Sequence, residues 1–236
     1  MKVAKYENLH IGNFLISVGY YLRELAGALP STLPTSINLT QQSGKADYTV
    51  GDLFGFLGGK CFILEFKKDQ KSIAGEMLKP QRKALIDELR KNDPLKQISV
   101  ISHLICYPTY EAKSMNYNLG PYCFEFGLNV QEPYDIKGVD NFIKKLMVNK
   151  VGATFSQIAQ YFDLLRKCAG TPTFKSSGTL FSYNSKSGFV YVEYEDLNVL
   201  NYKIEVDLEI QKKVIQQQNI DLNQGKKNDQ GMKFNM

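Results

Sequence analysis

The stretch of sequence that most restricts the fold runs from residue 51 to residue 69, GDLFGFLGGKCFILEFKKD. Apolar and aromatic residues stand on both sides of Gly58 and Gly59. A Gly-Gly pair favours a tight two-residue turn because both residues can adopt positive φ. The pattern predicts a β-hairpin within residues 46–67, in which residues whose numbers add to 117 face one another. Because both faces of this hairpin are apolar, we expect it to be buried inside a sheet.

Three ionisable residues interrupt the apolar hairpin: Asp52, Glu65 and Lys67. In the predicted register Asp52 stands opposite Glu65, and two carboxylates so placed repel each other unless one is protonated or a cation lies between them. A hard divalent cation such as Mg²⁺ takes oxygen ligands from such a pair. The side chain of Lys67 projects from the same face as Glu65, where it can hold or deprotonate a water beside the metal. The repulsion also predicts that removing either acid does not lower the stability of the metal-free protein.

The elements around the hairpin are predicted from hydrophobic periodicity and proline positions. Residues 12–28 have the spacing of an amphipathic helix, and residues 30–45 are expected to form an irregular connection. Residues 68–92 predict two helical pieces, the second starting near a proline. Residues 97–107 are rich in β-branched side chains and predict a buried strand. The expected order over residues 12–107 is therefore helix, strand, strand, helix, strand.

The second half of the chain is expected to elaborate this core with helices and a second hairpin. Thr154 is a candidate N-cap and Gly170 a candidate C-terminal residue for one amphipathic helix. The polar, Gln/Asn/Lys-rich residues 212–236 predict a disordered tail, which leaves a single domain over residues 1–211. The remaining predicted elements are a strand at 122–128, a short helix at 138–148 and a hairpin at 178–195.

Composition narrows the chemistry that this domain can perform. Only two histidines are present, which leaves little room for a His-rich metal site or a Ser-His-Asp triad. The four cysteines form no CxxC pair and are expected to be reduced core thiols, and His103 is expected to be a core histidine. The sequence has neither a membrane-length apolar run nor an apolar leader, so we expect a soluble cytoplasmic protein. A net charge of +5 is compatible with a phosphate-bearing partner.

An aspartate, a hairpin turn and then Glu-x-Lys resemble the active site of the PD-(D/E)xK nuclease superfamily, which includes restriction endonucleases and Holliday junction resolvases. The predicted element order is also similar to the αββαβ core of that superfamily. The resemblance implies an α/β fold with a restriction-endonuclease-like core and a mixed sheet. It implies hydrolysis of phosphodiester bonds, in DNA rather than RNA, with Mg²⁺ or Mn²⁺ as the cofactor. By this resemblance Asp52 and Glu65 hold the metal, Lys67 completes the motif, and Glu24 and Gln81 match further residues of such sites.

The motif departs from the family pattern at its first acid. The family's proline is missing, because Gly51 precedes Asp52 and Ala46 precedes Asp47. Asp47 is therefore a rival first acid. It has the opposite strand parity, so it would need a bulge, for which Gly51 is the candidate, to reach the site.

The resemblance also suggests partners and leaves one alternative open. A homodimer or larger complex is a further expectation, because cutting two strands commonly takes two sites. Stand-alone nucleases of this family often belong to microbial defence systems or mobile elements. The alternative is a catalytically inactive nuclease-fold subunit that binds nucleic acid or a partner protein, and no membrane partner is expected. Basic residues that follow the hairpin are the candidates for contacting a phosphate backbone: Lys68, Lys71, Lys79, Arg82 and Lys83.

Overall fold

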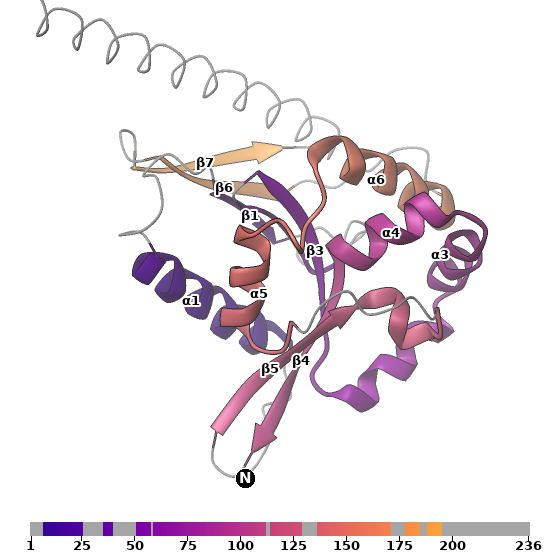
Figure 1. Cartoon of the computed structure of the whole chain (residues 1–236), viewed down its shortest axis with the longest axis horizontal. Helices are drawn as coiled ribbons and strands as arrows, with labels where there is room; N and C mark the ends of the chain where they lie inside the picture. The colour runs from indigo at the N-terminus through magenta and orange to yellow at the C-terminus, as the bar shows by residue number, and fades with distance from the viewer. Residues whose placement is uncertain are drawn as a thin grey trace, which may run out of the picture. The chain divides into compact units, whose positions relative to one another are not determined.

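The described part of the chain is an α/β structure built on one mixed sheet (Figure 1). The strands are ordered β5-β4-β3-β2-β1-β6-β7; β3 and β4 run parallel, and every other neighbouring pair is antiparallel. This computed structural model describes residues 7–25, 35–39, 51–57, 59–111, 114–128, 136–170, 178–184 and 188–194. The strands are β1 (Thr35–Leu39), β2 (Leu53–Leu57), β3 (Lys60–Phe66), β4 (His103–Glu111), β5 (Ser114–Pro121), β6 (Gly178–Asn184) and β7 (Gly188–Tyr194).

Helices pack on both faces of the sheet. In Figure 1, α1 and α5 lie to one side of the central strands, and α3, α4 and α6 lie to the other. Parallel strands need a crossover connection, and the helical segments between β3 and β4 provide it. None of the described helices is long and apolar enough to cross a lipid bilayer. The helical elements are α1 (Glu7–Leu25), the 3₁₀ helix η2 (Gln70–Leu78), α3 (Pro80–Lys91), α4 (Asp93–Ser102), the 3₁₀ helix η3 (Tyr122–Phe126), α5 (Val139–Met147) and α6 (Phe155–Ala169).

The predicted register of the β2–β3 hairpin is confirmed. Leu53 pairs with Leu64 and Leu57 with Lys60, so paired residue numbers add to 117 along the whole ladder. Every described residue of β2 and all of β3 beyond Lys60 are buried, as expected for a hairpin with two apolar faces. Leu57 pairs with Lys60, so two residues connect the strands, which is the loop length that the predicted register requires.

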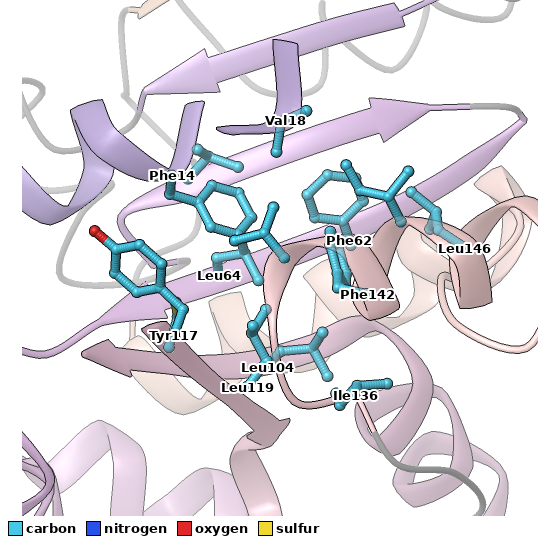
Figure 2. Close-up of a cluster of buried hydrophobic side chains, with 14 of the residues drawn as sticks. Phe14, Val18, Phe62, Leu64, Leu104, Tyr117, Leu119, Ile136, Phe142 and Leu146 are labelled. Atoms are coloured by element: carbon cyan, nitrogen blue, oxygen red, sulfur yellow. The ribbon is translucent and has the colours of Figure 1, made fainter. Parts of the chain in front are cut away.

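The face of the sheet covered by α1 and α5 carries an apolar core (Figure 2). Alternate residues of β3 point into it: Phe62, Leu64 and Phe66. The ring of Phe14 meets Phe66 edge-on with centroids 5.4 Å apart, and Phe62 meets Phe142 at 5.2 Å. Offset and edge-to-face aromatic pairs of this kind add to the burial of apolar area. This core anchors β3, the strand that carries the Glu-x-Lys motif.

Three predictions of local structure are wrong in whole or in part, and the strand predicted at residues 97–107 forms only from His103, where β4 begins. Residues 35–39 of the expected irregular connection form β1, which pairs with β2 and β6. Residues 97–102 belong to helix α4 and not to a strand, because Asn92 caps the helix by accepting a hydrogen bond from the Leu95 amide. Residues 122–126 form the 3₁₀ helix η3 instead of a strand. The crossover from β3 to β4 therefore contains more helix than expected.

The predicted elements that carry local end signals are confirmed. The hydroxyl of Thr154 accepts a hydrogen bond from the Gln157 amide in a capping box, and Gly170 ends α6 in the left-handed conformation. The helix at 139–147 and the hairpin of β6 and β7 also form where they were expected. Asp47 and the predicted tail at 212–236 lie outside the described residues.

Candidate active site

Asp52 lies at the point where β2 leaves the hairpin ladder. Its amide donates to the carbonyl of Leu64 at 3.0 Å, and its Oδ2 accepts a hydrogen bond from the Phe66 amide at 2.5 Å. The carboxylate thus pairs with the Phe66 amide of β3, which lies beyond Leu53–Leu64, the last pair of the ladder. Asp52 is 4% exposed, so this bond lies in the protein interior. The side chain is held at the same end of the hairpin as Glu65.

Asp52 and Glu65 do not form the cross-strand pair that the register predicted. The ladder ends at Leu53 and Leu64, and Gly51 turns away with a positive φ of 144°. A Cβ placed on Gly51 would lie 3.4 Å from Oε2 of Glu65 and 2.8 Å from Cγ2 of Ile63. Gly51, rather than Asp52, therefore lies next to Glu65. Asp52 instead bonds to the Leu64 carbonyl and the Phe66 amide, so at this residue the alternating pattern of the ladder ends.

Glu65 lies among cations. The Nζ of Lys67 is 2.8 Å from its Oε1, and Nη2 of Arg82 is 3.2 Å from its Oε2. The Nζ of Lys79 is more distant, at 4.0 Å from Oε1. Glu65 is 2% exposed and Lys67 is 6% exposed, so both charges depend on protein partners instead of water.

A second carboxylate, that of Glu76 on η2, completes the arrangement. Its Oε1 lies 2.9 Å from Nζ of Lys67 and 2.7 Å from Nζ of Lys79. Its Oε2 lies 3.6 Å from Nε of Arg82 and accepts a hydrogen bond from the Tyr122 hydroxyl at 3.4 Å. We call the five charged side chains the ion cluster: Glu65, Lys67, Glu76, Lys79 and Arg82.

The ion cluster favours the charged forms of Glu65 and Lys67. Burial alone would raise the pKa of Glu65, but the charges of Arg82 and Lys67 outweigh it and hold the pKa below its usual value. Burial alone would lower the pKa of Lys67, but the carboxylates of Glu65 and Glu76 raise it above its usual value. A protonated Lys67 cannot accept a proton from water, so in this state it acts as a fixed positive charge and a hydrogen-bond donor.

A network of aromatic and polar side chains adjoins the ion cluster. The ring of His103 stacks on Tyr122 with centroids 4.2 Å apart, and the guanidinium of Arg82 lies 5.3 Å from the centre of the same tyrosine ring. The Nδ1 of His103 lies 2.9 Å from the hydroxyl of Tyr161, which also meets Ser99 at 3.0 Å. Burial, and then the charge of Arg82, lowers the pKa of His103 well below 6.5. His103 is therefore a neutral core histidine, as the sequence predicted.

The other predicted site residues are dispersed. Glu24 is exposed near the C-terminal end of α1. The part of α1 that contacts the motif end of β3 is ten residues earlier, where Phe14 meets Phe66. Gln81 is buried on α3, next to Arg82. Glu24 is thus the one proposed site residue that the fold sets apart from the motif.

The predicted nucleic-acid contacts divide into two groups. Lys68, Lys71 and Lys83 are exposed, and the side chain of Lys79 is 34% exposed. Arg82 is 1% exposed and paired with both carboxylates of the ion cluster. The prediction that Arg82 contacts a phosphate backbone is therefore corrected, because its guanidinium faces the interior.

The expected effect of removing Glu65 is reversed by this geometry. The sequence argument assumed repulsion between two carboxylates, but Glu65 compensates buried cations at 2.8 and 3.2 Å. Removing one partner of a buried ion pair leaves an uncompensated charge and destabilises the fold. Glu76 and Arg82 were not recognised as cluster members, although Arg82 follows Pro80 on the predicted helix and both lie within 20 residues of Glu65.

No protein family, characterised protein or solved structure matches this chain. Its function has to be argued from the site itself. Within the residues that the structure describes, no group of three or more His, Cys, Asp or Glu side chains forms a ready-made metal site. The charged groups that converge are those of the ion cluster, and Asp52 is buried at the same end of the hairpin.

Proposed function

We propose that this chain is a metal-dependent nuclease that hydrolyses phosphodiester bonds, with DNA as its substrate. The observation that carries the proposal is where the motif falls on the hairpin. Asp52 directly precedes β2, Glu65 lies near the end of β3, and Lys67 directly follows it. The antiparallel pairing of β2 and β3 brings these three positions to one end of the hairpin.

The surrounding topology supports the same proposal. A helix precedes the hairpin, and β3 is followed by helices and then by the parallel strand β4. This order is similar to the core of the PD-(D/E)xK nucleases, in which the motif occupies the corresponding hairpin. Relative to the expected order, strand β1 is inserted between α1 and the hairpin, and β5, β6 and β7 extend the sheet at its two edges.

The carboxylates of Asp52 and Glu65 fit Mg²⁺ or Mn²⁺ in their donor chemistry. Mg²⁺ is commonly bound through one or two carboxylates, with waters and substrate phosphate oxygens completing its shell, so a larger cluster of acids is not required. The bound ion would supply Lewis-acid polarisation of the scissile phosphate. Lys67 and Arg82 compete for Glu65, so metal affinity depends on how readily these ion pairs rearrange.

The cations of the site can stabilise negative charge in the proposed reaction, and this role does not require them to accept a proton. Phosphodiester hydrolysis develops negative charge on the phosphate oxygens, and pre-organised donors in a site of low dielectric stabilise such charge. Lys67 is held between two carboxylates at the motif end of β3. Lys79 is partly exposed beside it. We assign Lys67 to charge stabilisation and water positioning, and Lys79 with Lys68 and Lys71 to phosphate contacts.

The test is cleavage of plasmid and single-stranded DNA with Mg²⁺ or Mn²⁺, comparing the wild type with Asp52→Asn and Glu65→Gln. These substitutions keep the size of the side chains. We expect each to reduce cleavage by about 1,000-fold or more, because a lost metal ligand removes several kcal/mol of transition-state stabilisation. Glu88→Gln is the matched control, because it removes a carboxylate that pairs with Lys91 and Lys167 at the surface.

The second candidate is an inactive nuclease-fold subunit, and one observation favours it: both carboxylate oxygens of Glu65 already contact cations. A divalent-ion titration followed by thermal unfolding separates the two candidates, since a ligand that binds only the folded state raises the melting temperature. A shift that Asp52→Asn abolishes supports the nuclease. No shift, together with no cleavage of DNA or RNA by the wild type, would establish the inactive subunit.

A further inference from the structure

Glu76 of η2 is a second carboxylate partner of Lys67, in addition to Glu65. The Nζ of Lys67 lies 2.9 Å from Oε1 of Glu76 and 2.8 Å from Oε1 of Glu65. A lysine has a flexible four-carbon stem and three rotatable donors, so a single partner leaves its ammonium group free to move. Two carboxylates at hydrogen-bond distance restrict it to one position.

Glu76 also balances the other cations of the cluster. Lys79 Nζ lies 2.7 Å from its Oε1, and Arg82 Nε lies 3.6 Å from its Oε2. Glu76 is 3% exposed, so its interactions are with protein groups. If Glu65 bound a metal ion, Glu76 would remain as the carboxylate that compensates the buried cations, because uncompensated buried charge is strongly unfavourable.

The local sequence of η2 sets the position of Glu76. Asp69 caps the segment by accepting hydrogen bonds from the amide of Ser72 at 2.8 Å and from its hydroxyl at 2.6 Å. Ile73 is buried and anchors the middle of the segment. The amide of Lys79 donates to the carbonyl of Glu76 at 3.1 Å, which closes its end. The segment is thus held at its start, middle and end, and the Glu76 side chain contacts Lys67 of the motif.

We infer that Glu76 is a positioning residue of the proposed nuclease site, which fixes the ammonium group of Lys67 at the end of β3 for contact with the substrate phosphate. The inference rests on the proposed function for its catalytic consequence, but the placement of Lys67 is a property of the folded protein alone. It extends the site from the hairpin to η2, because a misplaced charge loses much of its effect on a transition state.

The first measurement is the side-chain ammonium signal of Lys67 in ¹⁵N-lysine NMR spectra of the full chain, assigned by its disappearance in Lys67→Met. We expect a slowly exchanging signal in the wild type. Glu76→Gln should broaden or shift it, and Glu76→Asp should retain it in part. Asp87→Asn is the control, because it removes an exposed acid of α3 that pairs with Arg90. An unchanged Lys67 signal in folded Glu76→Gln protein would overturn the inference, whether or not the protein cuts DNA.

The second measurement is steady-state cleavage by the same variants, corrected for folded protein by circular dichroism. We expect Glu76→Gln to lower kcat by about 10- to 100-fold, the usual range for residues that orient a functional group, with little change in KM. Glu76→Asp should recover part of the loss. A wild-type kcat in Glu76→Gln would overturn the inference while leaving the nuclease in place. Absence of cleavage by the wild type would instead reject the nuclease, and the NMR result would then decide the placement of Lys67.

Discussion

The two faces of strand β3 are built on different physical principles. On the face toward α1 and α5, Phe62 and Leu64 pack against apolar side chains (Figure 2), and Phe66 belongs to the same core. On the opposite face, Cys61 and Ile63 are followed by Glu65, which enters the ion cluster. Both faces are equally well buried. The difference is that apolar burial is non-directional, whereas buried charges are tolerated only when each finds its partner.

This comparison shows where the protein can accept change. An apolar face adjusts to substitutions of similar volume, because total volume and pattern matter more than any single contact. The ion cluster lacks that tolerance, since three cations share two carboxylates and each residue contacts at least two others. Burying the charges of the ion cluster carries a desolvation penalty, and apolar residues of similar volume would stabilise the fold at least as well. This cost is the general reason to associate the ion cluster with function.

The largest expected effect comes from breaking the ion cluster at its most buried member. Arg82→Met should lower the free energy of unfolding by about 3–5 kcal/mol, because it leaves two buried carboxylates with fewer cations. Urea denaturation of the full chain measures the change. Arg90→Met, on the same helix but paired with Asp87 at the surface, should change stability by less than about 1 kcal/mol. Equal effects at the two positions would remove the distinction between the faces.

A smaller loss of stability is expected when the hydroxyl of a buried tyrosine is removed, and the size of the loss should differ between the two faces of the sheet. Tyr161→Phe removes the hydroxyl that meets both His103 and Ser99, and should cost about 1–3 kcal/mol because buried polar groups lose their partner. Tyr117→Phe removes a hydroxyl that donates to the His10 carbonyl at 3.1 Å, and should cost about 0.5–1.5 kcal/mol. Thermal and urea unfolding of both variants test the ranking. A larger loss for Tyr117→Phe would place the more demanding network on the apolar face.

Near neutral pH the smallest predicted effect is a dependence of stability on pH that arises from His103. Its pKa in the folded protein lies well below 6.5, because burial and the nearby Arg82 disfavour its charged form. The unfolded chain therefore binds a proton below about pH 6.5 that the folded chain does not. This contribution to stability is complete above that pH and decreases as the pH falls, with a slope approaching about 1.4 kcal/mol per pH unit.

The matched variants for this prediction are His103→Asn and Ser99→Ala. Both change the same hydrogen-bond network, but only the first removes the titrating group. Unfolding free energies between about pH 5 and pH 8 should show a weaker slope for His103→Asn than for Ser99→Ala and the wild type. Identical slopes in all three proteins would show that His103 does not titrate differently in the folded and unfolded states.

Local sequence signals determined a large part of this fold. The Gly58-Gly59 turn was enough to predict the β2–β3 register, and the capping residues Thr154 and Gly170 were enough to place α6. These signals act between residues that are close along the chain, so they are effective without knowledge of the tertiary structure. The Asp52, Glu65 and Lys67 motif could be located for the same reason, since its members belong to one hairpin.

Tertiary structure decided the features that depend on distant partners. Helix α4 forms in spite of its β-branched residues, because Asn92 caps it and its buried side chains pack on neighbouring elements. Strand β1 is defined by its pairing with β2 and β6. The partners of Glu65 are also a tertiary result: Arg82 reaches it from α3, and Glu76 of η2 pairs with the same arginine and with Lys67. Sequence alone indicates that a buried charge needs compensation, but which side chains provide it depends on how the elements meet in space.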